Sequence, residues 1–372
     1  MKIKQQISAL SAALAMTLAH NVQAVDLKWS GFLNTIGART NDSAVYLHDE
    51  GNIDDNGSFE ESTLGLNAIV TVSEHLSLAA QIASAPSNNS IDFDWGFGTY
   101  NLNENWAIKA GRVKFPGMLV SEYVRVGYAY PWIRPPEAVY SASMAAPAMG
   151  LDAYDGGALV YQVFGDNFDY SAEVYGGGRA TDMMDFDKMY GLVLRASNDI
   201  LTLVGSANWS TMAVPGSVDP MMAAMMNDIA GQDMLMLNAG ITADWNDFVL
   251  YAEYVRSTSD FVDTMGRNDS VDITSWYTTL GYRFGNLMPH VTYQSLEHGN
   301  GGLEQTGWTA GLRYDLGRST ALKLEWQRIE PKEANAGANV PMMLKNQFGL
   351  FEHLSTPSDE VDLVSVAVNF TF

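Results

Sequence analysis

The chain has 372 residues, no cysteine and a formal net charge of −22 at pH 7. The lack of cysteine excludes disulfides and thiolate metal sites, and the acidic balance argues against a nucleic-acid partner, which would need clustered Lys and Arg. Although 47% of the residues are apolar, they are spread at alternate positions rather than gathered in dense runs, as the wall of a membrane barrel requires.

The first 24 residues have the pattern of a secretory signal peptide. Lys2 and Lys4 form a charged start, residues 7–19 are apolar, and residues 22–24 (VQA) form a small-x-small cleavage pattern. A membrane anchor is disfavoured because a spanning helix needs roughly 20 apolar residues. We therefore expect residues 1–24 to be removed and residues 25–372 to form the exported protein.

The rest of the chain predicts strands joined by connections that are short and long in turn. Strands are indicated where apolar and polar side chains alternate, as at 62–72, 201–209 and 321–328. The short connections carry turn residues and fall at 73–75, 103–105, 165–167, 197–199, 244–247, 285–286 and 317–319. The long connections fall near 41–61, 84–91, 115–155, 177–187, 211–233, 259–270, 298–305 and 331–359.

Seven short and eight long connections make fifteen, which implies sixteen strands. An even strand number, with short turns at one end and long loops at the other, is the organisation of a bacterial outer-membrane barrel. The sequence thus predicts an all-β fold, a 16-stranded antiparallel transmembrane β-barrel with short periplasmic turns and long extracellular loops. Aromatic residues at strand ends are expected to form interfacial girdles: Trp106, Tyr170, Trp245, Phe248, Tyr282, Phe284, Phe370 and Phe372.

The third long connection, at about 115–155, carries the functional argument. Four prolines, at 116, 131, 135 and 136, restrict its backbone. GRVKFPG at 111–117 and VGYAYPWIRPPEAVY at 126–140 resemble a proteobacterial porin family that is distantly akin to general-diffusion and phosphate-selective porins. The resemblance implies that this loop folds into the barrel and narrows it, and that the protein is a homotrimer in the outer membrane of a Gram-negative cell.

Charged side chains of both signs lie in or beside this loop. Opposed charges across a narrow opening create a transverse field that sorts small solutes by charge and dipole. The alternative is that these residues pair with one another and pin the loop. The candidates for the constriction are Arg112, Lys114, Glu122, Arg125, Arg134, Glu137, Asp152 and Asp155.

Two details of the charge pattern remain open in the sequence. Strict alternation from Trp106 turns Arg112 outward, so either a bulge resets the phase or Arg112 lies at the rim. Alternation also places basic residues inside the lumen, at Lys109, Arg195, Arg283, Arg313 and Lys323. They slightly outnumber the inward acidic residues Glu173, Glu253, Asp315 and Glu325, which predicts a weak anion preference. The acidic outer loops argue the reverse, but the field is least screened at the constriction.

A methionine-rich segment at 219–226 (DPMMAAMM) starts with an N-cap residue and a proline at the first helical position. Its four methionines would lie roughly on one side of a short helix. Thioethers suit Cu(I), but no His or Cys is nearby. We therefore favour an apolar helix that packs into the vestibule or against another subunit.

The last strand is the most regular. In residues 364–372 the apolar side chains of Val364, Val366, Val368, Phe370 and Phe372 alternate with small or polar ones. This end resembles the C-terminal signature of bacterial outer-membrane barrels, which implies recognition of Phe372 by the barrel-assembly machinery. Phe372 is expected to close the barrel beside the first strand.

Together these features predict an outer-membrane porin that lets small hydrophilic solutes and ions diffuse passively. A substrate-specific channel for phosphate, other anions or small organic acids is the first alternative, and a barrel enzyme or adhesin is the second. No GxSxG, HExxH or phosphate-loop motif is present, so we expect no enzyme activity, no cofactor and no metal. The expected partners are outer-membrane lipid, lipopolysaccharide and two further copies of the chain.

Overall fold

The computed structural model describes residues 26–48, 51–85, 90–141, 152–181, 184–216, 218, 220–263, 265–333, 339–341, 349–351 and 356–372. The expected signal peptide, residues 1–24, lies outside the described residues. Within the described ranges, no helix is both long and apolar enough to span a membrane.

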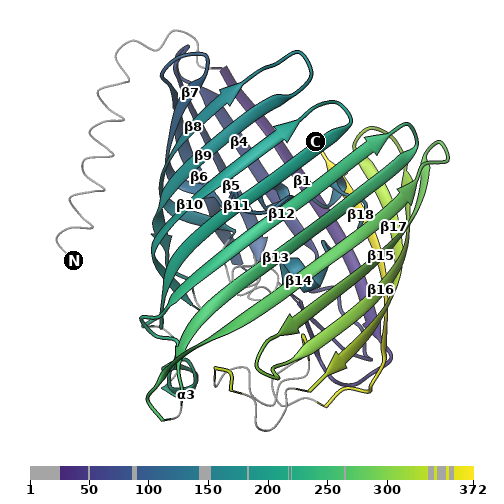
Figure 1. The fold of residues 1–372 in the computed structure, drawn as a ribbon. Helices are drawn as coiled ribbons and strands as arrows, with labels where there is room; N and C mark the ends of the chain where they lie inside the picture. The colour runs from purple at the N-terminus through teal and green to yellow at the C-terminus, as the bar shows by residue number, and fades with distance from the viewer. Residues whose placement is uncertain are drawn as a thin grey trace.

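Within these ranges, sixteen strands form one closed antiparallel barrel, in the order β1-β18-β17-β16-β15-β14-β13-β12-β11-β10-β9-β8-β7-β6-β5-β4 (Figure 1). The prediction of sixteen strands is confirmed. The strands are β1 Asp26–Thr40, β4 Thr63–Thr71, β5 Leu76–Ala85, β6 Ser90–Asn101, β7 Trp106–Lys114, β8 Ala153–Val163, β9 Asp169–Arg179, β10 Asp185–Ser197, β11 Leu201–Ala213, β12 Asp233–Trp245, β13 Phe248–Val262, β14 Asn268–Tyr282, β15 Leu287–His298, β16 Glu304–Asp315, β17 Thr320–Lys332 and β18 Val361–Thr371.

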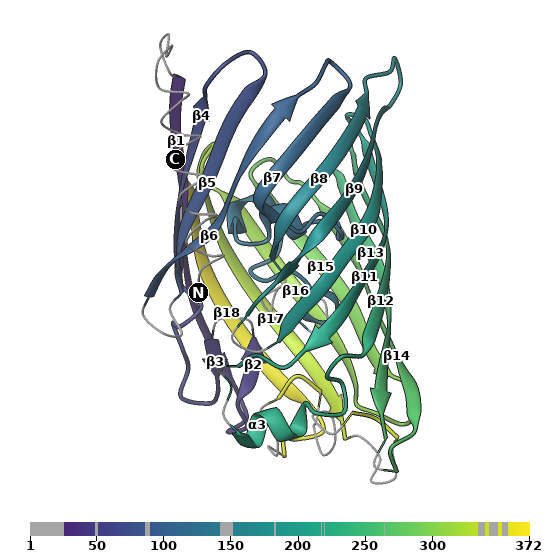
Figure 2. The ribbon, with the colours of Figure 1, turned by 90° about the vertical axis from the view of Figure 1, so that its left-hand side faces the viewer.

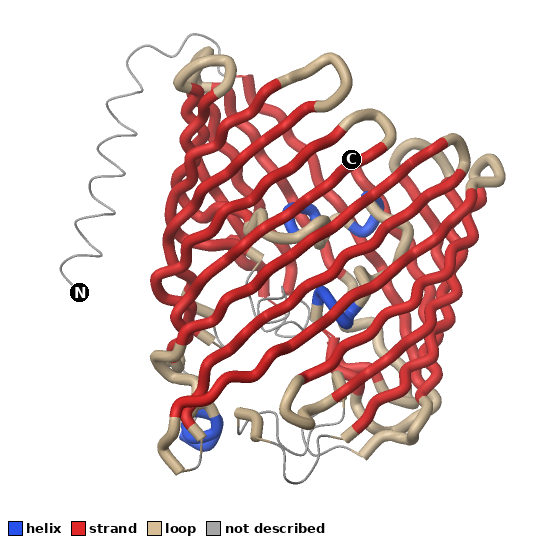
Figure 3. Tube along the Cα trace, in the orientation of Figure 1, coloured by secondary structure: helices blue, strands red, loops and turns tan. Residues whose placement is uncertain are grey.

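The connections follow the predicted plan. Each predicted short turn lies between two paired strands, as at 73–75 between β4 and β5 and at 317–319 between β16 and β17. The short turns lie together at one end of the barrel, and the long connections, with the helix α3 (Pro220–Met225), lie at the other (Figures 1 and 3). We call these the short-turn end and the long-loop end.

Every second side chain of each strand points outward. The outer face of the wall is apolar because most of these outward side chains are apolar. In β18, Val364, Val366 and Val368 are 43–52% exposed, whereas Ser365, between them, is 2% exposed. At the short-turn end, Trp245, Phe248 and Phe284 are exposed, and Phe248 packs edge-on to Tyr282. An exposed apolar surface of this kind is typical of contact with lipid or with another protein.

The two ends of the chain close the barrel. β1 pairs with β18 along nine residues, from Phe32 opposite Thr371 to Thr40 opposite Leu363. Phe372 exchanges two backbone hydrogen bonds with Gly31, of 2.9 and 3.1 Å. Its ring lies over Gly31, where an added Cβ would come within 2.4 Å of the ring. Closure thus depends on a residue without a side chain at position 31.

The first long loop carries a hairpin that the sequence did not predict. It consists of β2 (Tyr46–His48) and β3 (Gly51–Ile53). Tyr46 is fully buried and packs on Phe351 of the last long loop, with 5.1 Å between ring centroids. These two loops therefore cover the long-loop end of the wall at β1, β17 and β18.

The third long loop runs inside the barrel, as predicted. Its described part holds three short helical turns, η3 (Ser121–Tyr123), η4 (Gly127–Ala129) and α2 (Glu137–Tyr140). Figures 2 and 3 show these turns inside the barrel, about midway between its two ends. Below, this segment is called the inserted loop.

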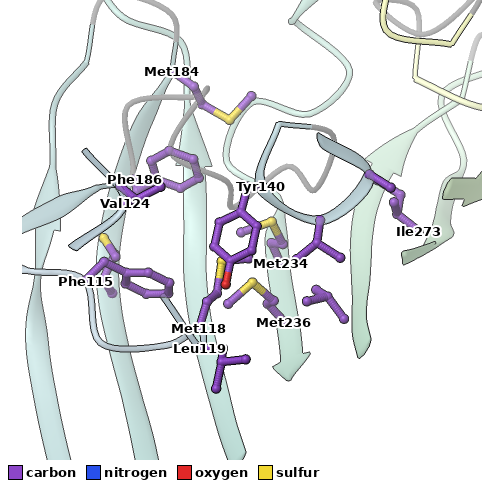
Figure 4. Packing of buried hydrophobic residues seen from close by; sticks show 14 of the residues in the cluster. Phe115, Met118, Leu119, Val124, Tyr140, Met184, Phe186, Met234, Met236 and Ile273 are labelled. Atoms are coloured by element: carbon purple, nitrogen blue, oxygen red, sulfur yellow. The ribbon is translucent and has the colours of Figure 1, made fainter. Parts of the chain in front are cut away.

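One sector of the lumen is apolar, which the sequence did not predict. Inward side chains of β10–β14 pack with the inserted loop in one buried cluster that includes Met189, Met212, Met234, Met236 and Ile273. Met118, Met234 and Met236 lie around Tyr140 (Figure 4). In β12 both faces are apolar over residues 234–237, so alternation does not indicate which face points into the lumen.

Candidate pore constriction

At Ile133 and Arg134 the inserted loop is held by a buried ion pair to the first long loop and by hydrogen bonds to the wall. Arg134 binds Glu61 of the first long loop, with Nε 2.6 Å from Oε1, and donates to Ser365 Oγ of β18 at 2.7 Å. The backbone N–H of Ile133 donates to Glu325 Oε1 at 2.7 Å. A buried charge is tolerated only when it is paired in this way. Arg134, a predicted constriction residue, is 5% exposed and anchors the loop.

Two of the predicted lumen residues also hold the loop. Lys323 Nζ donates to the carbonyl oxygens of Gly127 (2.6 Å), Tyr130 (2.9 Å) and Trp132. Arg313 donates to the carbonyl oxygens of Tyr128 and Tyr130 at 2.9 and 2.8 Å. Both cations thus satisfy backbone carbonyls of a loop that has only three short helical turns to pair such groups.

Further anchors lie on β13–β15. Trp132 Nε1 donates to Thr279 Oγ1 at 2.9 Å and to Thr292 Oγ1 at 3.1 Å. Glu137, a predicted constriction residue that is 2% exposed, accepts a hydrogen bond of 2.8 Å from Gln294. Arg134 and Glu137 therefore pin the loop, but through Glu61 and Gln294 and not by pairing with other constriction candidates as the alternative expected.

Glu253 of β13 is the main anchor near the start of the inserted loop. Its carboxylate accepts hydrogen bonds from the Leu119 N–H (2.7 Å), Asn238 Nδ2 (2.6 Å), the Tyr140 hydroxyl and the Tyr277 hydroxyl (3.3 Å). The side chain is 3% exposed. The Leu119 N–H and the Tyr140 hydroxyl fix the loop to this carboxylate, and Asn238 of β12 and Tyr277 of β14 hold the carboxylate in the wall, all without a cation.

A charged network, which we call the outer charge cluster, lies where the inserted loop leaves and rejoins the wall. Arg125 of the loop has Nε 3.6 Å from Asp94 Oδ1 and 3.5 Å from Asp152 Oδ2. Lys114, at the end of β7, lies 3.7 Å from Asp94, and Arg179, at the end of β9, lies 3.8 Å from Asp152. The structure therefore brings together three of the predicted constriction residues: Lys114, Arg125 and Asp152.

Asp94 and Arg179 were not predicted. A register shift between β5 and β6 pairs Gln81 with Trp95 and Ile82 with Phe93, which leaves Asp94 as the extra residue of a bulge. Bulges break the alternation of a strand in this way, and Asp94 points into the lumen, where it accepts a hydrogen bond from Gln81. The available signal was an acidic residue placed directly between two aromatic residues, Phe93 and Trp95.

The charge of Asp152 is stabilised by its neighbours. Burial opposes ionisation, but the nearby Arg125, Lys114 and Arg179 hold the pKa of the Asp152 carboxyl below its ordinary value. This residue is thus an anion at neutral pH, and the opposed signs of the outer charge cluster are present together.

Two more ion pairs lie closer to the short-turn end, one between β7 and β9 and one between β10 and Glu122 of the inserted loop. Lys109 Nζ is 2.9 Å from Glu173 Oε2, and Arg195 Nη2 is 3.1 Å from Glu122 Oε2. Lys109 and Arg195 keep 21% and 23% of their side chains exposed, and Glu122 keeps 42%. We call these four residues the inner charge cluster. Solvent therefore reaches charged groups inside the barrel.

The remaining predicted residues lie elsewhere. Arg112 pairs with Asp155, Nε to Oδ1 at 2.9 Å, and the pair lies on the outer face because it shares the phase of Ile108 and Leu159. No bulge turns Arg112 inward, so its position outside the lumen follows from strict alternation. Arg283 pairs with Asp244 at 2.6 Å, at the short-turn end of the wall.

The structure offers little for a metal ion. Among the described residues, no group of three or more His, Asp or Glu side chains is arranged to hold one. In the methionine-rich segment, Met221 is 74% exposed and Met226 is 2% exposed. The two thus lie in different environments. Asp219 and the side chains of Met222 and Met225 lie outside the described part.

The comparisons with known proteins agree with this geometry. The family model described as Gram-negative porin matches residues 216–334. The resemblance to Gram-negative porins is confirmed. No curated protein sequence matches the chain.

Solved structures show the same porin fold over nearly the whole chain. The anion-selective porin from Comamonas acidovorans has a TM-score of 0.60 at 12% identity, covering 94% of this chain and 100% of that one. OmpF of Salmonella typhi has a TM-score of 0.58 at 13% identity, covering 93% and 97%. The outer-membrane channel DcaP of Acinetobacter baumannii has a TM-score of 0.58 at 10% identity, covering 94% and 98%.

Proposed function

We propose that the protein is an outer-membrane porin through which small hydrophilic solutes and ions diffuse passively. The observation that carries the proposal is the position of the two charge clusters. The inserted loop is fixed to β10–β18 and β1, and one sector is filled by apolar side chains. The outer charge cluster, near β6–β9, and the inner one, near β7–β10, lie on the remaining side. In the outer cluster Arg125 keeps 23% of its side chain exposed and the carboxylates are buried, whereas Lys109, Arg195 and Glu122 of the inner cluster are partly exposed. Permeating solutes pass these groups.

The two clusters favour anions slightly. Their basic residues are Lys109, Lys114, Arg125, Arg179 and Arg195, and their acidic residues are Asp94, Glu122, Asp152 and Glu173. Five against four leaves one excess positive charge in a confined space. The similarity to an anion-selective porin supports the same preference, whereas the net acidic chain draws cations to the mouth.

The localisation and assembly follow from the same features. The apolar outer wall and the porin family match place the barrel in the outer membrane of a Gram-negative cell. A homotrimer is supported by the trimer form described for the similar barrel OmpT of Vibrio cholerae. Removal of residues 1–24 and recognition of Phe372 by the barrel-assembly machinery remain proposals from the sequence, as does contact with lipopolysaccharide.

A substrate-specific channel for phosphate or small organic acids is the second candidate. It is favoured by Lys114, whose Nζ is buried without a hydrogen-bond partner among the described residues and lies 3.7 Å from its nearest carboxylate. An oxyanion could supply that acceptor. No enzyme activity is proposed, because the clusters hold no nucleophile beside a base.

Recordings from the refolded protein in a planar lipid bilayer test both candidates. We expect discrete conductance steps and, in a salt gradient, a reversal potential on the anion side. Block of the chloride current by millimolar phosphate would favour the specific channel. Absence of any current from correctly folded protein would overturn the proposal, and a cation-directed potential would overturn the anion preference.

A further inference from the structure

A pocket on the outside of the barrel combines an aromatic pair with carboxylates. It has a volume of about 260 Å³ and lies across β10–β13. Tyr190 and Trp209 form its apolar side, with stacked rings whose centroids are 5.6 Å apart and whose planes differ by 13°. Its polar side is formed by Thr211, Asp233, Thr258 and Asp260. The pocket belongs neither to the lumen nor to the charge clusters.

The strand register places these side chains on the outer face. Trp209 is opposite Tyr190 and Leu235, and Leu235 is opposite Thr258. Tyr190 and Trp209 are 54% and 38% exposed. They form the last aromatic row before the long-loop end, because Thr211 and Asp233 form the next row toward that end. The pocket therefore lies where the apolar band of the wall meets the polar rim.

The electrostatics of the pocket favour a cation. Two carboxylates, Asp233 and Asp260, line it, and no Lys or Arg is among its lining residues. The neighbouring Arg256 is engaged by Asp272, with 2.6 Å between Nη2 and Oδ2. An anionic group would be repelled here, whereas an ammonium group gains from both the carboxylates and the faces of Trp209 and Tyr190.

We propose that this pocket binds the primary ammonium group of a lipid headgroup in the outer leaflet. The ammonium would lie against the rings of Tyr190 and Trp209 and donate hydrogen bonds to Asp233 and Asp260, while the acyl chains follow the apolar wall toward the short-turn end. The volume is close to the lower limit of about 300 Å³ for sites that hold drug-sized ligands, so it suits one small headgroup.

The occupant is a lipid because of where the pocket lies. Its aromatic side continues into exposed apolar side chains of the same strands, such as Leu203, Leu237 and Tyr254, which face hydrocarbon in a membrane. Its polar side faces the headgroup region. A soluble ligand would reach only the polar side, whereas a lipid places an apolar part and a charged part in the order that the wall presents them.

Binding of a defined lipid tests the proposal without any measurement of current. The full-length protein in detergent is titrated with a short-chain phosphatidylethanolamine and with the same lipid acetylated at its amine, and binding is followed by native mass spectrometry. We expect the amine form to bind and the acetylated form to bind about tenfold more weakly, since acetylation removes the charge. Equal binding of the two lipids would overturn the proposal.

Three variants separate this site from the general affinity of the wall for lipid. Asp233→Asn removes a carboxylate, and Trp209→Leu removes an aromatic face but keeps the surface apolar; each should weaken amine-lipid binding about fivefold. Trp245→Leu is the matched control, because Trp245 is 60% exposed at the opposite end of the wall, and it should bind as the parent does. If binding required Ca²⁺ and an anionic headgroup instead, the pocket would be a bridged phosphate site and the proposal would be wrong.

Discussion

The anchor at Glu253 gives the sharpest prediction about the constriction. Glu253→Ala removes the acceptor of four donors, from Leu119, Tyr140, Asn238 and Tyr277. The two tyrosine hydroxyls can rotate to other acceptors, but the Leu119 N–H and the Asn238 amide stay buried. Each buried donor without a partner costs about 1–3 kcal/mol, so the docked position of the loop start should lose about 2–6 kcal/mol. The wall does not depend on this contact and should stay folded.

The expected phenotype is a channel that fluctuates. Single-channel recordings of Glu253→Ala should show a higher mean conductance and frequent brief transitions, because residues 118–121 no longer remain in one position. Glu253→Gln keeps one oxygen acceptor and should lie between the parent and the alanine variant. Glu74→Ala, in an exposed short turn, is the control and should leave the recordings unchanged. A steady parental conductance from folded Glu253→Ala would refute the role of this anchor.

Three further predictions concern charge, closure and acid. Arg125→Glu turns five basic against four acidic groups into four against five, so the ratio of cation to anion permeability should rise about tenfold in salt-gradient recordings; no change would exclude Arg125 from the path. Deleting Phe372 removes both backbone hydrogen bonds to Gly31, so the yield of heat-modifiable barrel on gels should fall several-fold, with unchanged conductance in the barrels that do assemble; normal assembly would contradict this. Partial burial raises the pKa of Asp42, but hydrogen bonds from Ser358 outweigh it and hold the pKa below 3.8. A carboxyl group whose pKa is lower in the folded state stabilises the fold at pH values above its unfolded pKa, and this stabilisation is lost as the pH falls through its folded pKa. Protease cleavage of the first long loop should therefore rise only below pH 3.8. A rise at about pH 5 would contradict this role.

The wall could be predicted from the sequence because its physics is local. A strand with one face in lipid and one in water must alternate, as Val364 to Phe372 do, and a tight turn needs residues such as those at 285–286. Both signals are contained in a few consecutive residues. Arg112 was named as a constriction candidate although strict alternation alone would turn it outward, and the structure has it on the outer face beside Asp155.

The lumen was harder to predict because its contacts join distant segments. Arg134 and Lys323 carry charges that suit a pore, but their roles depend on the carbonyl and carboxylate groups they meet across the barrel. The apolar sector could not be predicted because Met234 and Met236 alternate with Leu235 and Leu237. Both faces of this strand are apolar, so the pattern does not indicate which face points into the lumen. Alternation from the exposed Phe93 turns Asp94 inward, but the bulge between β5 and β6 then breaks the phase at Trp95, which no short sequence window indicates.

The sequence distance between the inserted loop and its anchors has a consequence for assembly. Ile133 and Glu325 are 192 residues apart, and Arg134 and Ser365 are 231 residues apart. Contacts over such distances form late, because the chain between them must first be ordered. Glu325 and Ser365 lie on the last two strands. Ile133 and Arg134 of the loop therefore cannot bind them before those strands are in place. We therefore expect the contacts of Ile133 and Arg134 to form after β17 and β18 are in place, whereas Glu253 of β13 can hold Leu119 and Tyr140 earlier.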